Sequence, residues 1–312
     1  VYEWTEIQSL SLGVPVTCVK ISNKGKQLAA CTSQGELLIY DIINDSISEK
    51  HKIKAHDYGI NCVCWTKDDI FIATASDDTT IKIFDVKDGV LKQHIKGHTL
   101  AVFSIAFSPR NNIIVSGSWD ETIRTFSVRT GAEIHRINAH QDPVTAVDIS
   151  PDGLLLLSSS FDGLIRVWDN NTGKCLCTLV RDKKVVKHPP VSFVKFTPNS
   201  KFLLSASLDS SITLWDIEST SSKQHYYGHK NEKYCMSASF TQIPTHYIKE
   251  TPSKNHNTQY IVSGSETGYI YLWNVNTAKN EHRIKAHDQP IMSVDAHPST
   301  TFFITSSLDG TI

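Results

Sequence analysis

A repeat marked by a histidine and an aspartate limits what this chain can fold into more than any other feature. The first three marked histidines are 42 residues apart, and each stands 22 residues before its aspartate. A fourth pair near the end of the chain keeps the interval of 22. The four pairs are His56 and Asp78, His98 and Asp120, His140 and Asp162, and His287 and Asp309. A unit of this length cannot bury both of its faces alone, so the copies must pack against one another.

The copy that begins at His140 has the pattern of four short strands. β-rich or apolar runs alternate with turn signals, of which Pro151-Asp152-Gly153 and Asp162-Gly163 are the clearest. The predicted strands are Val144 to Ile149, Leu154 to Leu157, a third that ends at Asp169, and Lys174 to Val180. Four antiparallel strands in a period of roughly 40–45 residues, with histidine and Trp-Asp landmarks, are typical of a WD40 β-propeller blade.

We therefore predict an all-β fold, a seven-bladed WD40 β-propeller closed by the N-terminal strand, as one domain over residues 1–312. The last blade is expected to be split between residues 1–10 and 290–312, because closure removes free sheet edges. No aromatic residue follows Ile312, which suggests that natural residues are absent there. Residues 242–258, rich in Pro, Thr, Asn and Lys, are predicted to form an inserted loop between the first two strands of blade six.

Composition excludes several classes of function. The net charge of −1 provides no field that would favour nucleic acid or an acidic membrane surface. No apolar stretch reaches the roughly 18 residues of a membrane span, and the first residues are not those of a signal peptide. The seven cysteines are irregularly spaced, and the pairs Cys62/Cys64 and Cys175/Cys177 are expected to be small buried hydrophobes on strands. A disulfide framework and a zinc site are not expected, and the protein is predicted to be intracellular.

A histidine–aspartate pair can also indicate acid–base catalysis or a metal site. A catalytic pair should occur once, however, and this one recurs in four blades. The alternative is a hydrogen-bond network within each blade, which in blade four would join His140, Asp162, Ser158 or Ser160, and Trp168. The chain has no Gly-rich phosphate loop, G-x-S-x-G elbow or HExxH sequence. We therefore expect no catalytic residue, no metal and no cofactor, and we do not expect an enzyme.

Propellers commonly bind partners at the mouth of their central channel. Two positions of each blade point there: the start of the innermost strand and the residue before the hairpin aspartate. The first set is Thr17, Asn61, Phe103, Thr145, Ser192, Cys235 and Met292; the second is Asp77, Trp119, Phe161, Leu208, Glu266 and Leu308. Aromatic rings and carboxylates around one opening could hold a cationic side chain. The alternative, that these residues only plug the opening, stays open.

Six stretches resemble one family more closely than WD40 proteins in general. They are HTLAVFSIAF, HQDPVTAVDIS, SSSFDGLIRVWD, PPVSFVKFTPN, GHKNEKYC and IVSGSETGYIYLWN. The chain resembles, over its whole length, the WD40-repeat scaffold subunit of COMPASS/MLL-type histone methyltransferase complexes, the WD-repeat protein five family. The resemblance implies a non-catalytic nuclear subunit, monomeric within a hetero-oligomer that contains a SET-domain catalytic subunit and another WD40-type subunit. It also implies indirect association with a histone H3 tail or nucleosome.

In that family one face takes an arginine between two aromatic rings, and the opposite side binds an acidic-hydrophobic peptide. By position, the arginine site corresponds to Asp77, Phe103, Phe161, Ser192, Phe193, Tyr234 and Cys235, with Ser237 where the family has its second aromatic. The peptide groove at blades five and six corresponds to Asn199, Phe202, Leu214 and Phe240. Gln242 replaces an aliphatic residue beside that groove. These departures and the insertion indicate a divergent, fungal member of the family.

Three functional hypotheses follow. The first is a non-catalytic scaffold of a nuclear histone H3 lysine (H3K4-type) methyltransferase complex, which binds other subunits through the channel mouth and the groove at blades five and six. The second is a generic WD40 adaptor of another complex, such as one for ubiquitin ligation or a vesicle coat; the blade-five and blade-six stretches argue against it. The third is an enzyme with its active site in the channel, which would need one convergent set of catalytic groups, and the sequence offers none.

Overall fold

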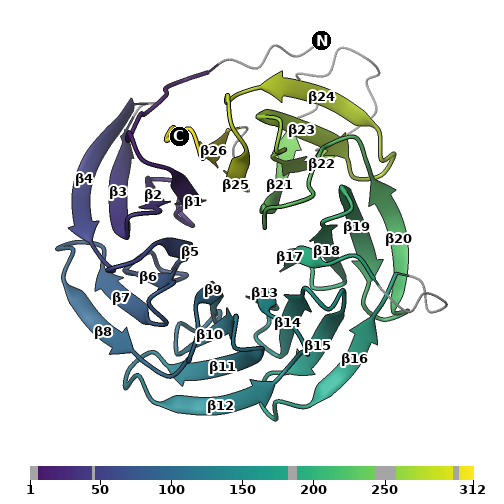
Figure 1. The fold of residues 1–312 in the computed structure, drawn as a ribbon, viewed down its shortest axis with the longest axis horizontal. Helices are drawn as coiled ribbons and strands as arrows, with labels where there is room; N and C mark the ends of the chain where they lie inside the picture. The colour runs from purple at the N-terminus through teal and green to yellow at the C-terminus, as the bar shows by residue number, and fades with distance from the viewer. Residues whose placement is uncertain (1–5, 44–45, 182–187, 244–257, 298–301) are drawn as a thin grey trace.

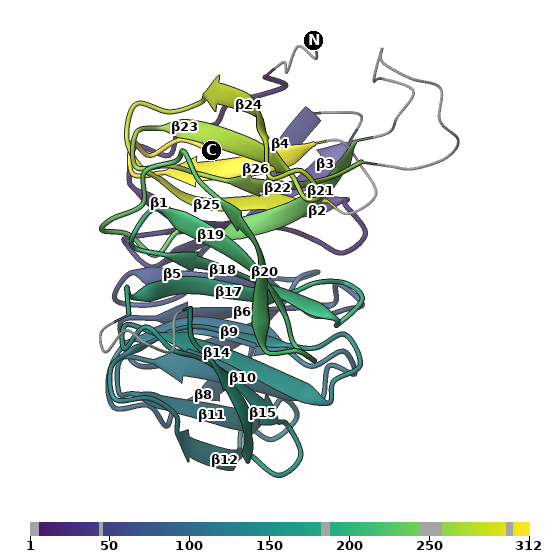
Figure 2. The same cartoon turned by 90° about the vertical axis from the view of Figure 1, so that its right-hand side faces the viewer.

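A computed structural model describes residues 6–43, 46–181, 188–243, 258–297 and 302–312. The regular elements in these ranges are β-strands. They form six four-stranded antiparallel sheets and one two-stranded sheet, arranged in a ring around a common axis (Figure 1). Seen from the side, the sheets follow one another around the ring, and their connecting loops emerge on two opposite faces (Figure 2).

Each four-stranded sheet is one blade, with its strands in chain order from the axis outward. Blade one holds β1 (Val16–Ile21), β2 (Gln27–Thr32), β3 (Glu36–Ile43) and β4 (Ser46–Lys54). Blade two holds β5 (Ile60–Trp65), β6 (Phe71–Ser76), β7 (Ile81–Asp85) and β8 (Leu91–Ile95). Blade three holds β9 (Val102–Phe107), β10 (Ile113–Ser118), β11 (Thr122–Ser127) and β12 (Glu133–Asn138).

The second half of the ring repeats this order. Blade four holds β13 (Val144–Ile149), β14 (Leu155–Ser160), β15 (Ile165–Asp169) and β16 (Cys175–Leu179). Blade five holds β17 (Val191–Phe196), β18 (Phe202–Ser207), β19 (Ser211–Asp216) and β20 (Ser221–Tyr226). Blade six holds β21 (Ala238–Ile243), β22 (Thr258–Ser263), β23 (Tyr269–Asn274) and β24 (Asn280–Lys285). The two-stranded sheet holds β25 (Ile291–Ala296) and β26 (Phe303–Ser307).

The prediction of seven blades is wrong, because the structure has six four-stranded blades and β25 and β26 form only a two-stranded sheet. After the turn at Gly310, Thr311 makes a single β-bridge with Ser11, and the described residues at the two ends form no further strand. A single bridge is too short to count as a ladder, so the described residues do not supply the expected third and fourth strands. Residues 1–5, which were expected to contribute to the closing strand, lie outside the described part of the chain, as do residues 244–257 of the predicted insertion.

The two ends of the described chain nevertheless meet. Leu10 N–H donates to Ile312 O over 3.1 Å, and Ile312 N–H donates back to Leu10 O over 2.9 Å. Leu12 N–H donates to Gly310 O over 2.8 Å. The side chains of Leu10, Leu12 and Ile312 pack with blade one in a single hydrophobic cluster. Residues 10–12 therefore join the two-stranded sheet to blade one.

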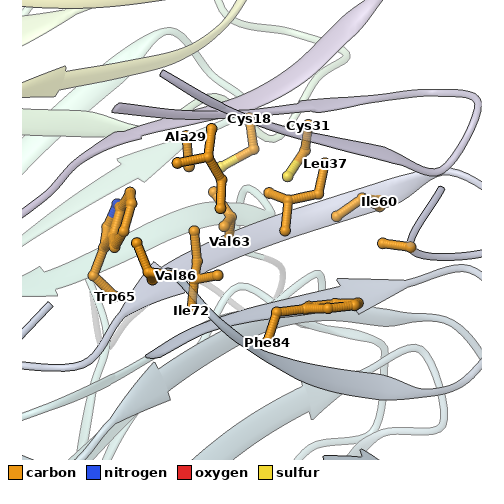
Figure 3. Close-up of a cluster of buried hydrophobic side chains, with 12 residues drawn as sticks. Cys18, Ala29, Cys31, Leu37, Ile60, Val63, Trp65, Ile72, Phe84 and Val86 are labelled. Atoms are coloured by element: carbon orange, nitrogen blue, oxygen red, sulfur yellow. The ribbon is translucent and has the colours of Figure 1, made fainter. Parts of the chain in front are cut away.

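The core is divided into seven layers, each lying between neighbouring sheets. Figure 3 shows the layer between blades one and two, in which Cys18 and Cys31 of blade one face Val63, Ile72 and Phe84 of blade two. The second strand of a blade is buried on both faces, as β6 and β10 are after their first residue, whereas the outermost strands are half exposed. Burial of both faces explains why these second strands are runs of apolar and small residues instead of alternating ones.

Deleting residues 1–12 should destabilise the protein by ~2–4 kcal/mol, because three backbone hydrogen bonds and the packing of two leucines are lost. Deleting only residues 1–7 is the matched control, since Leu10 and Leu12 remain. Thermal unfolding followed by circular dichroism compares the two. Equal melting temperatures for the two deletions would contradict this account of how the ends are joined.

Candidate partner-binding surfaces

Blade four contains a complete hydrogen-bond network around its histidine. The Nδ1 atom of His140 lies 2.9 Å from Asp162 Oδ2, and its Nε2 lies 2.8 Å from Ser158 Oγ. The indole N–H of Trp168 donates to the same Ser158 oxygen over 2.9 Å. Both ring nitrogens of His140 are therefore occupied within the blade, and the ring is buried. A histidine bonded on both sides has no free nitrogen with which to serve a substrate.

Three other sheets repeat the arrangement with Thr or Ser on the second strand. The histidine–aspartate distances are 2.8 Å for His56 and Asp78, 2.9 Å for His98 and Asp120, and 3.2 Å for His287 and Asp309. The Nε2 partners are Thr74 at 2.7 Å, Ser116 at 2.7 Å and Thr305 at 2.8 Å. Burial lowers the pKa of His56. Burial also opposes ionisation of Asp78, but hydrogen bonds from Thr80 and His56 outweigh it and lower the pKa of that carboxyl group.

Blade five replaces the histidine with an arginine that our sequence analysis missed. The guanidinium of Arg181 donates to Asp209 and, over 3.1 Å, to Ser211 Oγ. Its second terminal nitrogen donates to Tyr227 Oη over 2.8 Å. Arg181 thus links the hairpin aspartate of blade five to the chain that leads into blade six. The signal in the sequence was a hairpin aspartate with no histidine 22 residues before it.

Blade six keeps the histidine but lacks its partner. His229 is buried, and neither ring nitrogen has a hydrogen-bond partner among the described residues. Its ring instead lies edge-on to Trp273, with centroids 5.3 Å apart. In this hairpin Thr267 stands at the position of the aspartate, and Glu266 precedes it. No carboxylate among the described residues therefore binds the ring of His229. Burial lowers the pKa of His229 to about 4.

Three aromatic residues form a continuous cluster at the predicted channel mouth. Phe103 and Trp119 meet edge to face with centroids 5.3 Å apart, and Trp119 meets Phe161 in the same way at 6.3 Å. The side chain of Trp119 is 47% exposed. We call Phe103, Trp119 and Phe161 the aromatic cluster; they come from blades three and four. The family resemblance had assigned Phe103 and Phe161 to the arginine site, but not the Trp119 that joins them.

An acidic residue lies beside the aromatic cluster. The amide of Asn61 donates to Asp77 Oδ1 over 2.7 Å and to the carbonyl of Val102 over 3.1 Å. Val102 directly precedes Phe103, so Asn61 links the exposed carboxylate of Asp77 to the backbone at the start of the strand that carries Phe103. The structure therefore brings together Asp77, Phe103 and Phe161 of the predicted arginine site. An exposed carboxylate next to aromatic faces suits a cationic side chain.

The remaining residues of the predicted arginine site lie in different surroundings. Ser192 is buried and donates to Ala206 O over 3.1 Å, and Phe193 packs into the hydrophobic clusters beside blade five. Tyr234 and the exposed Cys235 follow a loop that is bonded to Glu266. The backbone N–H groups of Glu232 and Lys233 in this loop donate to Glu266 Oε1 over 2.7 and 2.5 Å. The carboxylate of Glu266 thus positions the loop that carries Tyr234 and Cys235.

Ser237, which stands where the family has its second aromatic ring, joins blade six to the two-stranded sheet. Its hydroxyl lies 3.0 Å from Ser293 Oγ and accepts the N–H of Val294 over 2.9 Å. Ser104 makes the same kind of link between blades three and four, accepting the N–H of Val147 over 3.1 Å. A phenylalanine at position 237 would break this contact, so the serine has a structural use here.

The residues of the predicted groove at blades five and six share one hydrophobic cluster. Phe202, Leu214 and Phe240 belong to it; Leu214 is buried and both phenylalanine rings are half buried. Asn199 lies in the turn before β18, where its Oδ1 accepts hydrogen bonds from Thr197 and from the N–H of Lys201. The structure therefore places the two phenylalanines between blades five and six, with part of each ring exposed.

Four charged residues on the innermost strands were not anticipated from the sequence. Each is the fifth residue of its strand: Lys20 of β1, Asp148 of β13, Lys195 of β17 and Asp295 of β25. Lys20 Nζ lies 3.3 Å from Asp295, and Asp148 accepts the N–H of Phe196 over 2.8 Å. Burial raises the pKa of Asp148 and lowers that of Lys195, where the charge of Lys20 adds to the effect. Their common register was the signal that sequence reasoning overlooked.

The described ranges offer neither a metal-binding cluster nor a membrane-spanning helix. These ranges contain no group of three or more His, Cys, Asp or Glu residues that could hold a metal ion. The part of the chain that the structure describes has no helix able to cross a membrane. All seven cysteines are free, and Cys175 is exposed, so the expectation that it is a buried hydrophobe is wrong.

Two histidine substitutions should have opposite effects on stability. His140→Phe should destabilise by ~1–3 kcal/mol, because it leaves Asp162 and Ser158 without a buried partner. His229→Phe should stabilise, because it removes two buried nitrogens that have no partner. The difference in unfolding free energy between His229→Phe and the parent should be ~2 kcal/mol larger at pH 5 than at pH 7. The folded pKa of His229, about 4, lies below that of an unfolded histidine, so the parent loses stability as pH falls below ~6.5.

Urea unfolding at pH 7 and pH 5 measures both effects, and each variant serves as the control for the other. Loss of stability on His229→Phe at both pH values would show that the ring of His229 has a bonding partner after all.

Comparison with known proteins identifies the family of this chain. The family model described as the WDR5 beta-propeller domain matches residues 11–312. Similar proteins include the COMPASS component SWD3 of Saccharomyces cerevisiae, 38% identical over 79 residues, which are 25% of this chain and 24% of that protein. WD repeat domain-containing protein 83 homolog of Dictyostelium discoideum is 33% identical over 96 residues, 31% of this chain and 25% of that protein.

WD repeat-containing protein 1 of Mus musculus is 36% identical over 72 residues, 23% of this chain and 12% of that protein. Each of these matches therefore spans a quarter or less of the relative's own length. The family model, in contrast, covers nearly the whole chain, and WD40 propellers of this kind are generally non-catalytic and bind partner proteins. The chain belongs to the WDR5 beta-propeller domain family.

Proposed function

We propose that this protein is a non-catalytic scaffold subunit of a nuclear histone H3 lysine methyltransferase complex of the H3K4 type. The observation that carries the proposal is the match of the WDR5 family model over residues 11–312. The similarity of a shorter stretch to a protein named as a COMPASS component supports it. As a scaffold, the chain would bind a SET-domain subunit and another WD40-type subunit through separate surfaces.

The channel mouth is the first of these proposed surfaces. The aromatic cluster offers the exposed face of Trp119 and the half-buried ring of Phe103, with the carboxylate of Asp77 held beside them by Asn61. A guanidinium gains both from ring faces and from a carboxylate that can accept its N–H groups. We propose that an arginine of a partner binds here, on one side of the opening, because Ser237 supplies no second ring.

The groove between blades five and six is the second proposed surface. Phe202 and Phe240 each keep part of their ring exposed over a shared hydrophobic cluster. Half-buried aromatic residues in a groove are typical anchors for an extended peptide, because they are rigid and offer a large apolar area. This groove would take an acidic-hydrophobic peptide of another subunit, as in the family that the chain resembles.

The similarity to other WD-repeat proteins favours a second candidate. WD repeat domain-containing protein 83 homolog and WD repeat-containing protein 1 match over 96 and 72 residues, comparable with the 79 residues of the COMPASS component. A scaffold of a different complex, such as a ubiquitin ligase or a vesicle coat, would use the same propeller surfaces. Affinity purification of the full chain from its source cells with mass spectrometry separates the two. A SET-domain protein among the partners supports the first candidate, and its consistent absence excludes it.

Phe103→Ala should weaken the binding of an arginine-containing histone H3 peptide by about tenfold, since one ring face is worth on the order of 1 kcal/mol. Isothermal titration calorimetry with the parent and the variant measures this. Leu176→Ala is the control, because Leu176 is also a large exposed side chain but lies on the outermost strand of blade four. Equal affinities of parent and Phe103→Ala would place the arginine elsewhere.

Phe202→Ala combined with Phe240→Ala should release the subunit that binds the groove at blades five and six, while the chain stays folded. The control is Leu155→Ala combined with Ile217→Ala, two half-buried apolar side chains that pack in the hydrophobic cluster of blades four and five, outside every proposed binding surface. Both double variants lose similar packing, so a pull-down compared with melting temperatures separates binding from stability. If the Phe202→Ala, Phe240→Ala variant retains the subunit at parental affinity, the proposed binding site at blades five and six is refuted.

A further inference from the structure

A second groove lies between blades two and three, outside every surface assigned so far. It has a volume of about 610 Å³ and is lined by β6, β7 and β8 on one side and by β10, β11 and β12 on the other. Its floor is apolar, with Phe71 and Ile83 from blade two and Ile113 and Val128 from blade three. The two blades are neighbours in the ring, and their outermost strands β8 and β12 follow each other along its rim (Figure 1).

This groove repeats the construction of the one between blades five and six. Phe71 begins β6 and pairs with Asp85, as Phe202 begins β18 and pairs with Asp216. Two residues after these phenylalanines, Ala73 of β6 pairs with Ile83, and Leu204 of β18 pairs with Leu214. The groove between blades two and three and the proposed groove at blades five and six therefore have an aromatic and an aliphatic residue in the same register. The groove between blades two and three lies toward the face opposite the channel mouth, because Phe71 starts the strand that Asp77 follows.

One uncompensated positive charge lies along this groove. Lys92 and Arg129 are the charged residues that line it. Lys92 already pairs with Asp85 at 3.4 Å and with Asp88 at 3.6 Å. Arg129 is exposed and makes no ion pair or hydrogen bond within the described ranges. The guanidinium of Arg129 is thus an uncompensated cation beside an apolar floor, which favours a carboxylate on whatever binds there.

The groove also offers free hydrogen-bond donors. The side-chain oxygen of Asn112 accepts a hydrogen bond from Ser108 Oγ over 2.8 Å, while its NH₂ group donates to no described residue. Gln93, which lines the opposite wall, has no side-chain hydrogen bond in the part of the chain that the structure describes. Amide donors on both walls suit the backbone carbonyls of an extended peptide. On the rim, the side chain of Ile134 is 45% exposed and extends the apolar surface.

We propose that the groove between blades two and three binds an extended peptide of a partner protein in which an acidic residue stands next to aliphatic residues. The carboxylate would pair with Arg129, the aliphatic side chains would cover Ile113 and Ile134, and the peptide backbone would meet the amides of Gln93 and Asn112. This site is separate from the proposed arginine site, since it lies on the other face. One chain can therefore hold partners at both places at once.

A display library of random twelve-residue peptides, selected on the full chain, tests the proposal. The parent should enrich peptides in which Asp or Glu adjoins Leu, Ile or Val, and the double variant Arg129→Glu with Ile134→Asp should lose that enrichment. The control is Asn171→Glu with Leu176→Asp, the exposed positions that correspond in blade four. Both pairs alter exposed side chains, so melting temperatures should stay near that of the parent.

The most enriched peptide is then synthesised with a fluorescent label. By fluorescence anisotropy, Arg129→Glu alone should raise its Kd by about tenfold or more, because an attraction is replaced by a repulsion. The control double variant should bind within about twofold of the parent. The proposal is overturned if the parent enriches no acidic-aliphatic peptide, or if the enriched peptides bind equally well to the Arg129→Glu, Ile134→Asp variant.

Discussion

The rest of the structure depends on the junction at which the first and last sheets of the ring meet. A ring of sheets is stable only if every sheet has a neighbour on both faces, because each hydrophobic layer lies between two sheets. At the junction, residues 10–12 bond to residues 310–312, and Asp295 pairs with Lys20 at 3.3 Å and accepts the N–H of Ile21 at 3.0 Å. This junction packs blade one against the two-stranded sheet in one hydrophobic layer. The described residues achieve this without a complete third or fourth strand.

In blades two, three and four and in the two-stranded sheet, a buried polar network gives the hairpins a single geometry. Histidine, aspartate and a hydroxyl bond to one another, so each buried donor and acceptor has a partner. Blades five and six show what happens when one member changes. In blade five Arg181 reaches Asp209 from a different direction, whereas in blade six His229 stays buried without a partner and is kept by its ring contacts alone. The fold tolerates such a loss in one blade because the other networks and the hydrophobic layers remain.

The two faces of the ring differ in chemistry, and this difference separates the proposed binding events. One face carries the aromatic cluster and Asp77, which suit a cation. The other carries the groove between blades two and three, where an apolar floor lies beside the positive charge of Arg129. A scaffold gains from this division, because partners that bind opposite faces do not compete for the same surface. The innermost strands between the faces hold buried charges, including the Lys20–Asp295 pair, whose role here is to join sheets.

The sequence by itself determined the repeat, the four-strand pattern of six blades and the pairing of His140 with Asp162, because these follow from local spacing and from the need of buried polar groups for partners. The structure decided that the hydroxyl partner of His140 is Ser158 and not Ser160. The sequence also predicted that Phe103 and Phe161 lie at the mouth of the central channel. Only the tertiary structure decided that six sheets have four strands and the last has two, since that depends on whether Thr311 can find a full ladder. The use of Ser237 as a link to Ser293, the arginine that replaces a histidine in blade five, and the groove beside Arg129 were likewise outside the reach of the repeat. Each of them arises between blades, where distances are fixed by packing around the ring and not by the spacing of residues along the chain.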